Sequence, residues 1–330
     1  MSGHGGRGFV DAVARFAAEV ANPQVAAIAE GLAAPLRVAV AGRRGVGRRT
    51  VANALECLGI SVTPDRAADL VVYVIAEVAK PEDAATLAAL AQPVLVVLNK
   101  SDLTGRAAAA AVSARLAAPV EPMAALLAVA ALGGRLDGPL WAALQVLAAE
   151  PADLSCAEHF VTGPHPVPRR VRQQLCDTLD LPGITQAVAA ARQDWPAAQV
   201  RVLLRRLSGI DAVADRVSAV GAAVRYQRLL DAVARLAALA VSDGRISDFL
   251  LRDDTVVARM AAAVQVVQAA GLAVDAVDTA DAATQLRQAA RWQRYSRGPV
   301  AAVHHACGTD IARGLLRLWS GAGGPAQGPA

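Results

Sequence analysis

Lysine is almost absent from this chain of 330 residues. Of its 33 lysines and arginines, only Lys80 and Lys100 are lysines. Such a preference for arginine indicates a high-GC genome, and in particular an actinobacterial one. An arginine at a position where a motif requires lysine therefore reflects codon bias as readily as a change in chemistry. A motif that does contain one of the two lysines is correspondingly less often a chance match.

Aromatic residues are also scarce. They make up 3% of the chain, whereas hydrophobic residues as a whole make up 55%. Alanine, valine and leucine supply most of the apolar surface, which favours closely packed helices. The length is sufficient for two domains that each bury a core. Because the net charge is only +4 and acids and bases are interspersed, we expect no basic stripe of the kind that binds nucleic acid.

Cysteines and long apolar runs are few. No pair of cysteines has the spacing of a metal or redox motif, so we expect buried, reduced thiols in a cytosolic protein. The four are Cys57, Cys156, Cys176 and Cys307. No run approaches the ~18 uncharged apolar residues of a membrane span, and Asp11 and Glu19 interrupt the apolar core that a signal peptide needs. We expect a cytoplasmic protein, with peripheral contact to the inner membrane left open.

Alternating strand and helix patterns dominate the segment 33–150. Short apolar runs predict buried strands at 36–41, 70–75, 94–98 and 120–123, each followed by a helix. Continuous apolar strands of this kind are typical of a parallel sheet covered on both faces. The prediction is a doubly wound α/β domain with its ligands at the carboxyl ends of the strands. Residues 1–32 are predicted to form a helical lead-in to this domain.

The pattern changes after residue 150. Prolines and a glycine mark a linker at 151–168, and the segment 169–320 is predicted to be an all-α, stalk-like helical bundle. Pro182 is expected to open a helix, since proline is tolerated in the first turn. The residues at 210, 213, 217, 220 and 224 follow the spacing of a packed helix seam, whose phase shifts at Tyr226. They are Ile210, Val213, Val217, Val220 and Val224. The tail, 321–330, is expected to be disordered.

A glycine loop directly follows the first predicted strand. Residues 42–50 match the spacing of a phosphate-binding loop, with Gly42 and Gly47 at the two glycine positions. Arg48 stands at the lysine position and Arg49 at that of the magnesium-binding hydroxyl, while Thr50 lies about 100° further round a helix. The candidate phosphate-binding residues are Gly42, Gly45, Gly47, Arg48, Arg49 and Thr50. On the loop alone, a turn that binds nothing is an equally good interpretation.

A second motif, Asn-Lys-Ser-Asp at 99–102, follows the third predicted strand. It matches the guanine-specificity motif of GTPases, in which the aspartate accepts two hydrogen bonds from guanine, the lysine stem packs on the base and the asparagine braces the loop. After the fourth strand, two alanines stand where GTPases have a backbone donor to guanine. A polar turn is the alternative interpretation. The candidate guanine-binding residues are Asn99, Lys100, Asp102, Ala124 and Ala125, and the candidate ligands are GTP and GDP.

The switch loops of a GTPase are missing. The segment 58–68 is too short to contain both switches and their strands, and Asp69 has no glycine three residues later. Without metal ligands and a group that positions water, phosphoryl transfer loses its main electrostatic stabilisation. We therefore assign no catalytic residue and no metal ligand, and we expect neither bound Mg²⁺ nor GTP hydrolysis.

Several segments resemble the isoniazid-inducible dynamin-like GTPases of mycobacteria. The resemblance is carried by Leu-Cys-Asp-Thr-Leu-Asp-Leu-Pro-Gly-Ile at 175–184, Leu-Arg-Arg-Leu-Ser-Gly-Ile at 204–210, the strand at 34–42 and Arg-Trp-Gln-Arg at 291–294. The family implies a GTPase head on a helical stalk, self-association and membrane remodelling. Nucleotide contact carries over to Gly47, Asn99 and Asp102, but hydrolysis does not, since the family's lysine, serine and switches are absent.

Three functions follow from these observations. The leading one is a dynamin-like pseudo-GTPase with weak or lost nucleotide binding. It would act as an interaction or regulatory subunit, paired with a second copy or with an active dynamin-like paralogue at the membrane. The second is a slow GTPase that uses Arg48 or a partner's residues. The third is a structural interaction protein without a nucleotide.

Overall fold

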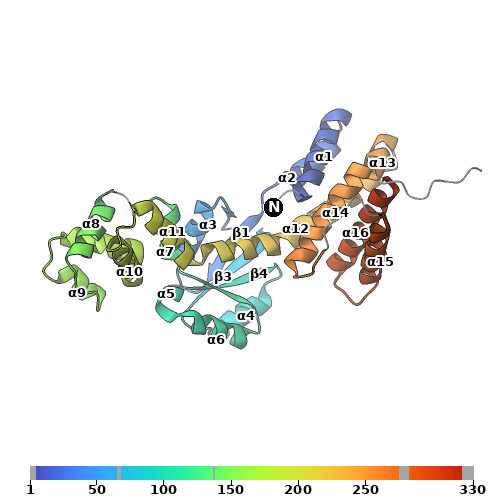
Figure 1. Ribbon diagram of the computed structural model, residues 1–330. Coiled ribbons are helices and arrows are strands. Elements are labelled where there is room, and N and C mark those ends of the chain that lie inside the picture. The colour runs from blue at the N-terminus through green and yellow to red at the C-terminus, as the bar shows by residue number, and fades with distance from the viewer. Residues whose placement is uncertain (1–4, 65–67, 137, 275–281, 322–330) are drawn as a thin grey trace, which may run out of the picture. The chain divides into compact units, whose positions relative to one another are not determined.

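The computed structural model describes residues 5–64, 68–136, 138–274 and 282–321. The chain forms two compact units. The α/β unit consists of Leu36–Ser218, and the helical unit combines Met1–Pro35 with Ala219–Ala330. Figure 1 labels most of the elements of both units.

The sheet of the α/β unit has five parallel strands in the order β2-β1-β3-β4-β5. The strands are β1 (Arg37–Gly42), β2 (Ser61–Val62), β3 (Leu70–Ala76), β4 (Val94–Asn99) and β5 (Val120–Met123). The predicted parallel α/β architecture is confirmed. The two-residue edge strand β2 was not predicted, because so short a strand has no apolar run of its own. With this order, the chain reverses its direction of winding between β1 and β3, which is where doubly wound sheets bind ligands.

Helices cover both faces of the sheet (Figure 1). Alternate residues of β3 and β4, among them Tyr73 and Leu98, point to one face and pack with Ala109 and Val112. The helices on this face are α4 (Pro81–Ala89) and α6 (Arg106–Leu116). The other face carries α3 (Arg48–Cys57) and α7 (Ala125–Leu132), which contact each other. Burial on both faces explains why these strands are apolar throughout.

The segment predicted as a linker is packed rather than free. It contains α9 (Ala157–Thr162), whose Phe160 and Val161 are buried in one cluster with residues of α7, α8, α10 and α11. The bounds of the others are Gly138–Ala149 (α8), Arg169–Ala191 (α10) and Ala197–Ser208 (α11). Arg172, itself 4% exposed, donates to the carbonyl oxygens of Phe160 and Gly163. The α/β unit therefore extends to Ser218, whereas the sequence placed its end at residue 150.

Helix α10 is interrupted in the way that Pro182 predicted. Asp180 has φ 57° and ψ 170°, so the helix breaks there, and its carboxylate accepts a hydrogen bond from the Leu181 amide. Pro182 follows in the first turn of the second half, where its missing N–H leaves no helical bond unmade.

The helical unit joins the two ends of the chain. Phe16 of α1 stacks on Phe249 of α13 with ring centroids 4.2 Å apart, and α1 contacts α14. Residues 1–32 thus belong with the C-terminal helices and are not a lead-in to the sheet. The helices are α1 (Gly5–Val20), α2 (Pro23–Ala33), α12 (Ile210–Ala240, which begins in the α/β unit), α13 (Gly244–Leu251), α14 (Asp253–Ala269), α15 (Ala282–Ser296) and α16 (Ala302–Gly321).

The remaining expectations concern seams, thiols and the tail. Along α12, Ile210, Val213 and Val217 are buried first, and a cluster containing Tyr226 follows, as the phase shift predicted. Of the cysteines only Cys307 is buried, and burial raises the pKa of its thiol to about 12; the expectation that all four are buried is wrong. Gly321 ends α16, and 322–330 lie outside the described residues. No helix in the described ranges is long and apolar enough to cross a membrane.

Candidate functional site

The glycine loop connects β1 to α3, and three of its glycines have positive φ angles. These are Gly42 at 138°, Gly45 at 86° and Gly47 at 87°, a region that side chains disfavour. A Cβ on Gly42 would lie 2.3 Å from the carbonyl oxygen of Val74, and one on Gly47 would lie 2.3 Å from Nδ2 of Asn99. The loop therefore has a tight shape that only glycine permits at these positions.

Asn99 joins the two motifs that the sequence singled out. It ends β4 and is 3% exposed. Its Nδ2 donates to the carbonyl oxygen of Val46 at 2.9 Å, and its Oδ1 accepts from the amide of Ala125 at 3.0 Å. One side chain thus ties the glycine loop to the loop after β5, across the carboxyl end of β3. The sequence analysis expected Asn99 to brace a loop, and its two hydrogen bonds hold both loops.

The structure contradicts the expectation that Ala124 or Ala125 donates to guanine. The amide of Ala124 donates to the carbonyl oxygen of Ser208 at 2.9 Å, and that of Ala125 donates to Asn99. Both residues are buried, so their amides need partners within the protein. Gly209 turns at φ 70° so close to the carbonyl oxygen of Pro122 that a Cβ would lie 2.5 Å from it. The Leu-Ser-Gly-Ile segment therefore packs where a base contact was expected.

The other two residues of the guanine motif remain accessible in part. Lys100 is exposed and has φ 60°, and it precedes the short helix α5 (Ser101–Thr104). Asp102 lies in the first turn of α5 and is half-buried. Burial raises the pKa of its carboxyl group, and the nearby carboxylate of Asp180 in α10 adds to the rise. Only the ionised form is the pure acceptor that guanine recognition needs.

The two arginines that replace the lysine and the hydroxyl of a phosphate loop begin α3. Arg48 and Arg49 are exposed, and within the described part of the chain their side chains have no hydrogen-bonding or ionic partner. Thr50 follows and is half-buried. Among the residues that the structure describes, no three His, Cys, Asp or Glu side chains gather to hold a metal ion.

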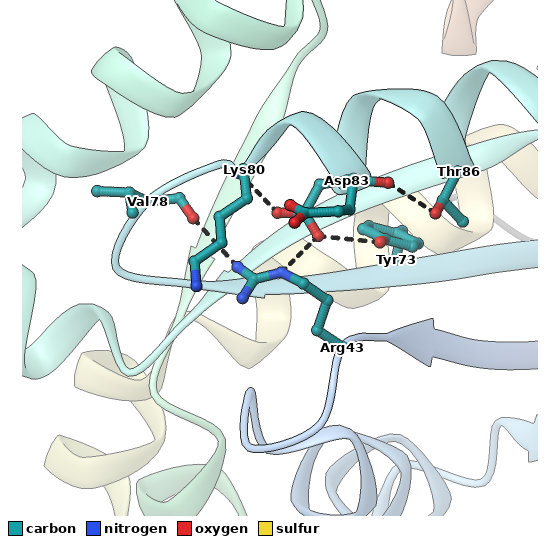
Figure 2. A network of polar contacts seen from close by, with 7 residues as sticks. Arg43, Tyr73, Val78, Lys80, Asp83 and Thr86 are labelled. Atoms are coloured by element: carbon teal, nitrogen blue, oxygen red, sulfur yellow. Dashed lines mark hydrogen bonds and ion pairs between the residues drawn. The ribbon is translucent and has the colours of Figure 1, made fainter.

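A polar network beside the glycine loop was missed by the sequence analysis (Figure 2). The carboxylate of Asp83 is fully buried. Its Oδ1 accepts from Arg43 Nε at 2.9 Å and from the Tyr73 hydroxyl at 3.0 Å, and its Oδ2 accepts from the Lys80 amide at 2.8 Å. Burial alone would raise the pKa of Asp83, but these hydrogen bonds outweigh it and hold the pKa below its ordinary value. The sequence Lys-Pro-Glu-Asp at 80–83 could have indicated this network, because an acidic residue at the third position of a helix typically accepts a hydrogen bond from the N-cap amide.

This network connects the loops after β1 and β3, where the winding of the sheet reverses. Arg43 belongs to the glycine loop, and its second nitrogen donates to the carbonyl oxygen of Val78 at 3.4 Å. The site therefore consists of a glycine loop held on one side by Asn99 and on the other by Asp83. Comparison with family models, curated proteins and solved structures gives no match for the chain.

Replacement of Asp102 by asparagine is expected to stabilise the protein at neutral pH by about 1–3 °C in Tm. Because the folded-state pKa is raised above the ordinary value of 3.8, the ionised carboxylate weakens the folded state, and this penalty is complete only above the raised pKa. The gain should shrink as the pH falls towards 3.8. Thermal unfolding of both proteins at several pH values measures it.

The matched control is Asp177→Asn, which alters an exposed carboxylate of α10. It should leave Tm nearly unchanged across the same pH range. A loss of stability in Asp102→Asn at neutral pH would show that the hydrogen bonds of the carboxylate outweigh its burial.

Proposed function

We propose that this chain is a dynamin-like pseudo-GTPase, in which the α/β unit keeps the shell of a guanine-nucleotide site but does not hydrolyse GTP. The observation that carries the proposal is the side chain of Asn99, which bridges the glycine loop and the loop after β5. A free turn has no need of such a brace. Its presence supports a loop that is kept in shape for a phosphate, whose oxygens would accept from the loop's amides.

The absence of hydrolysis rests on chemistry at the same loop. Arg49 offers no oxygen to Mg²⁺, and Thr50 is one residue too late to replace the usual hydroxyl. In its described residues, 58–64 and 68–69, the connection from α3 to β3 holds the two-residue strand β2, and its twelve residues leave no room for two switch loops. Phosphoryl transfer depends on a metal and a positioned water for its electrostatic stabilisation, and this site supplies ligands for neither.

Guanine recognition is weak in this proposal because the backbone donors expected to contact the base already donate hydrogen bonds within the protein. The amides of Ala124 and Ala125 donate within the protein, so only Asp102 and the stem of Lys100 remain to read the base. Without a backbone donor, an acceptor atom of the guanine base has no hydrogen-bonding partner in the site, which lowers the affinity for the nucleotide. We therefore expect guanine nucleotide to bind weakly, with binding stronger at a pH where Asp102 is ionised.

The role proposed for the chain is that of an interaction or regulatory subunit. Its partner would be a second copy or a dynamin-like paralogue that retains catalysis, with the membrane as the place of action. The resemblance of the segments at 175–184 and 204–210 motivates this part of the proposal. In the structure, the second of these segments packs against the loop after β5, which couples the helices to the nucleotide loops within one unit.

Thermal unfolding with GDP, GTP and ATP, each with and without Mg²⁺, tests the proposal. A ligand at 100 times its Kd stabilises the folded state by about 2.7 kcal/mol. We expect a rise in Tm with GDP and GTP but not with ATP. In Asp102→Asn, the rise in Tm that GDP or GTP causes should be smaller than in the unaltered protein, when each protein is compared with itself without ligand. Phosphate release from GTP should stay at background.

Two outcomes would contradict the proposal. GTP turnover that disappears in an Asn99→Ala/Asp102→Ala double variant would show a slow GTPase. No shift with any nucleotide would favour the third function named above, that of a structural interaction protein. The internal pairing of the Ala124 and Ala125 amides favours this alternative.

A further inference from the structure

The glycine loop carries more positive charge than the described residues around it neutralise. Residues 42–50 contain Arg43, Arg44, Arg48 and Arg49 and no acid. Arg43 is paired with Asp83. In the described part of the chain, the side chains of Arg44, Arg48 and Arg49 have no hydrogen-bonding or ionic partner, and all three are exposed. This charge is available to an anion from solution.

Lys80 adds a cation from the other side of the β1/β3 switch point. Its backbone amide and the Arg43 guanidinium bind the two oxygens of the same Asp83 carboxylate, at 2.8 and 2.9 Å. The buried carboxylate thus fixes Lys80 beside the glycine loop, although it lies on the loop before α4 (Figure 2). The side chain of Lys80 is exposed and, among the described residues, has no hydrogen-bonding or ionic partner.

A compact ammonium is the group that the glycine loop itself lacks. Arg48 presents a planar fork in place of the point charge that a lysine would place between phosphate oxygens. With no metal ligands at the loop, the charge of a polyphosphate must also be neutralised by side chains. Only two lysines exist in the chain, and one of them is held at this position.

We infer that Lys80 is the phosphate-binding lysine of this domain, supplied by the β3–α4 loop, and that the site takes a polyphosphate group without Mg²⁺. The inference rests on the proposed function and specifies how its phosphates are held. Glu77 on this loop and Glu82 in the first turn of α4 are exposed. The hydrogen bond to Asp83 is the main cause that raises the pKa of Arg43, and the charge of Glu82 adds to the rise. These acids oppose an anion, so Glu82→Gln should strengthen binding.

Amine labelling provides a direct test, because Lys80, Lys100 and the N-terminus are the only primary amines in the chain. An acylating reagent is applied to the full chain in EDTA, with and without saturating inorganic tripolyphosphate, and labelling is followed by mass spectrometry. We expect tripolyphosphate to slow labelling of Lys80 several-fold and to leave Lys100 unchanged. GTP should slow Lys80 as well.

Variants extend the test to affinity. Lys80→Ala should weaken tripolyphosphate binding about tenfold, because a hydrogen bond to a charged group is lost. Arg115→Ala, which removes an exposed cation in the last turn of α6, is the control and should change the affinity less than twofold. Both positions are exposed, so the variants should fold, and circular dichroism verifies that they do.

The outcomes separate this inference from the proposed function. If GTP raises Tm while Lys80 is labelled at its free rate, the inference is overturned and the proposed function stands. If tripolyphosphate protects Lys80 but guanine nucleotides bind no better than adenine nucleotides, the inference stands and guanine recognition falls. If no ligand raises Tm or slows labelling, both fall. A requirement for Mg²⁺ in Lys80 protection would also overturn the inference.

Discussion

Gly42→Ala is expected to destabilise the α/β unit by about 4 kcal/mol. Two effects combine, each of about 1–3 kcal/mol: a strained backbone for a residue with a side chain, and overpacking against a neighbour. The φ angle of Gly42 is 138°, and its Cβ would lie 2.3 Å from the carbonyl oxygen of Val74. That oxygen belongs to β3, which pairs with β1 at this residue, so neither strand can move away without breaking the sheet. The midpoint of urea unfolding measures the effect.

Gly45→Ala is the matched control within the same loop. Gly45 also has a positive φ, 86°, but nothing lies within 4 Å of its Cβ position. Only the backbone term remains, so we expect a loss of about 1–2 kcal/mol. An equal loss of unfolding free energy in the two variants would show that backbone strain accounts for the whole effect. The contact with Val74 would then relax without a measurable loss of stability.

Arg43→Ala is expected to lower the midpoint of urea unfolding clearly at neutral pH, because it leaves a buried carboxylate without its charged partner. Asp83 is fully buried, and only the Tyr73 hydroxyl and the Lys80 amide would still donate to it. In the unaltered protein the pKa of Asp83 is held below 3.8, so its stabilisation is present above that pH and is lost as the pH falls through the lower folded-state pKa. Urea unfolding at several pH values measures the difference.

The pH dependence distinguishes a lost ion pair from lost packing. The gap between the two proteins should be widest near neutral pH. It should narrow as the pH falls through the Asp83 pKa of the variant, which the loss of Arg43 raises, and should close below the lower pKa of the unaltered protein, where Asp83 is protonated in both. A gap of the same size throughout would mean that the stem of Arg43, and not its charge, stabilises the loop. Arg44→Ala, which removes an exposed arginine one residue away, should stay within about 0.5 kcal/mol at every pH.

The parts of the site that sequence predicted are those that depend on residues close together in the chain. Gly42 and Gly47 were recognisable because positive φ angles and close backbone approach require glycine. Asn99 was recognisable because a polar residue directly after a buried strand of a parallel sheet must lie at the carboxyl edge. Since the carboxyl ends of parallel strands share one edge, the meeting of these two motifs followed from strand positions alone.

The parts that sequence did not predict depend on which distant groups become partners. The amides of Ala124 and Ala125 were expected to be free, but Ser208 and Asn99 accept their hydrogen bonds. Nothing local in the sequence indicates that Ser208 would lie there, because the chain passes through α8, α9 and α10 before it returns. The pairing of Arg43 with Asp83 is equally remote, since an arginine and an aspartate 40 positions apart form no pattern.

Domain boundaries show the same division. The prolines after residue 150 predicted a linker, yet Phe160 and Val161 within it are buried, because a proline-rich segment packs when a neighbouring core offers space for its apolar residues. Likewise, residues 1–32 were predicted to be helical, but their sequence did not show that Phe9 and Phe16 would join the core of the helical unit. The periodicity of a sequence shows that a helix has an apolar face. Which other element packs against that face depends on shape and burial over the whole fold.

The sequence by itself determined the alternation of strands and helices, the glycine loop and the brace at Asn99, because these follow from local periodicity and backbone sterics. Only the tertiary structure decided that the amides of Ala124 and Ala125 are already bonded, that Asp83 holds the glycine loop, and that Lys80 lies beside it. Each of these features depends on which groups, distant in the chain, lie next to each other after folding. Buried polar groups need hydrogen-bonding partners, and the fold determines which partners are within reach.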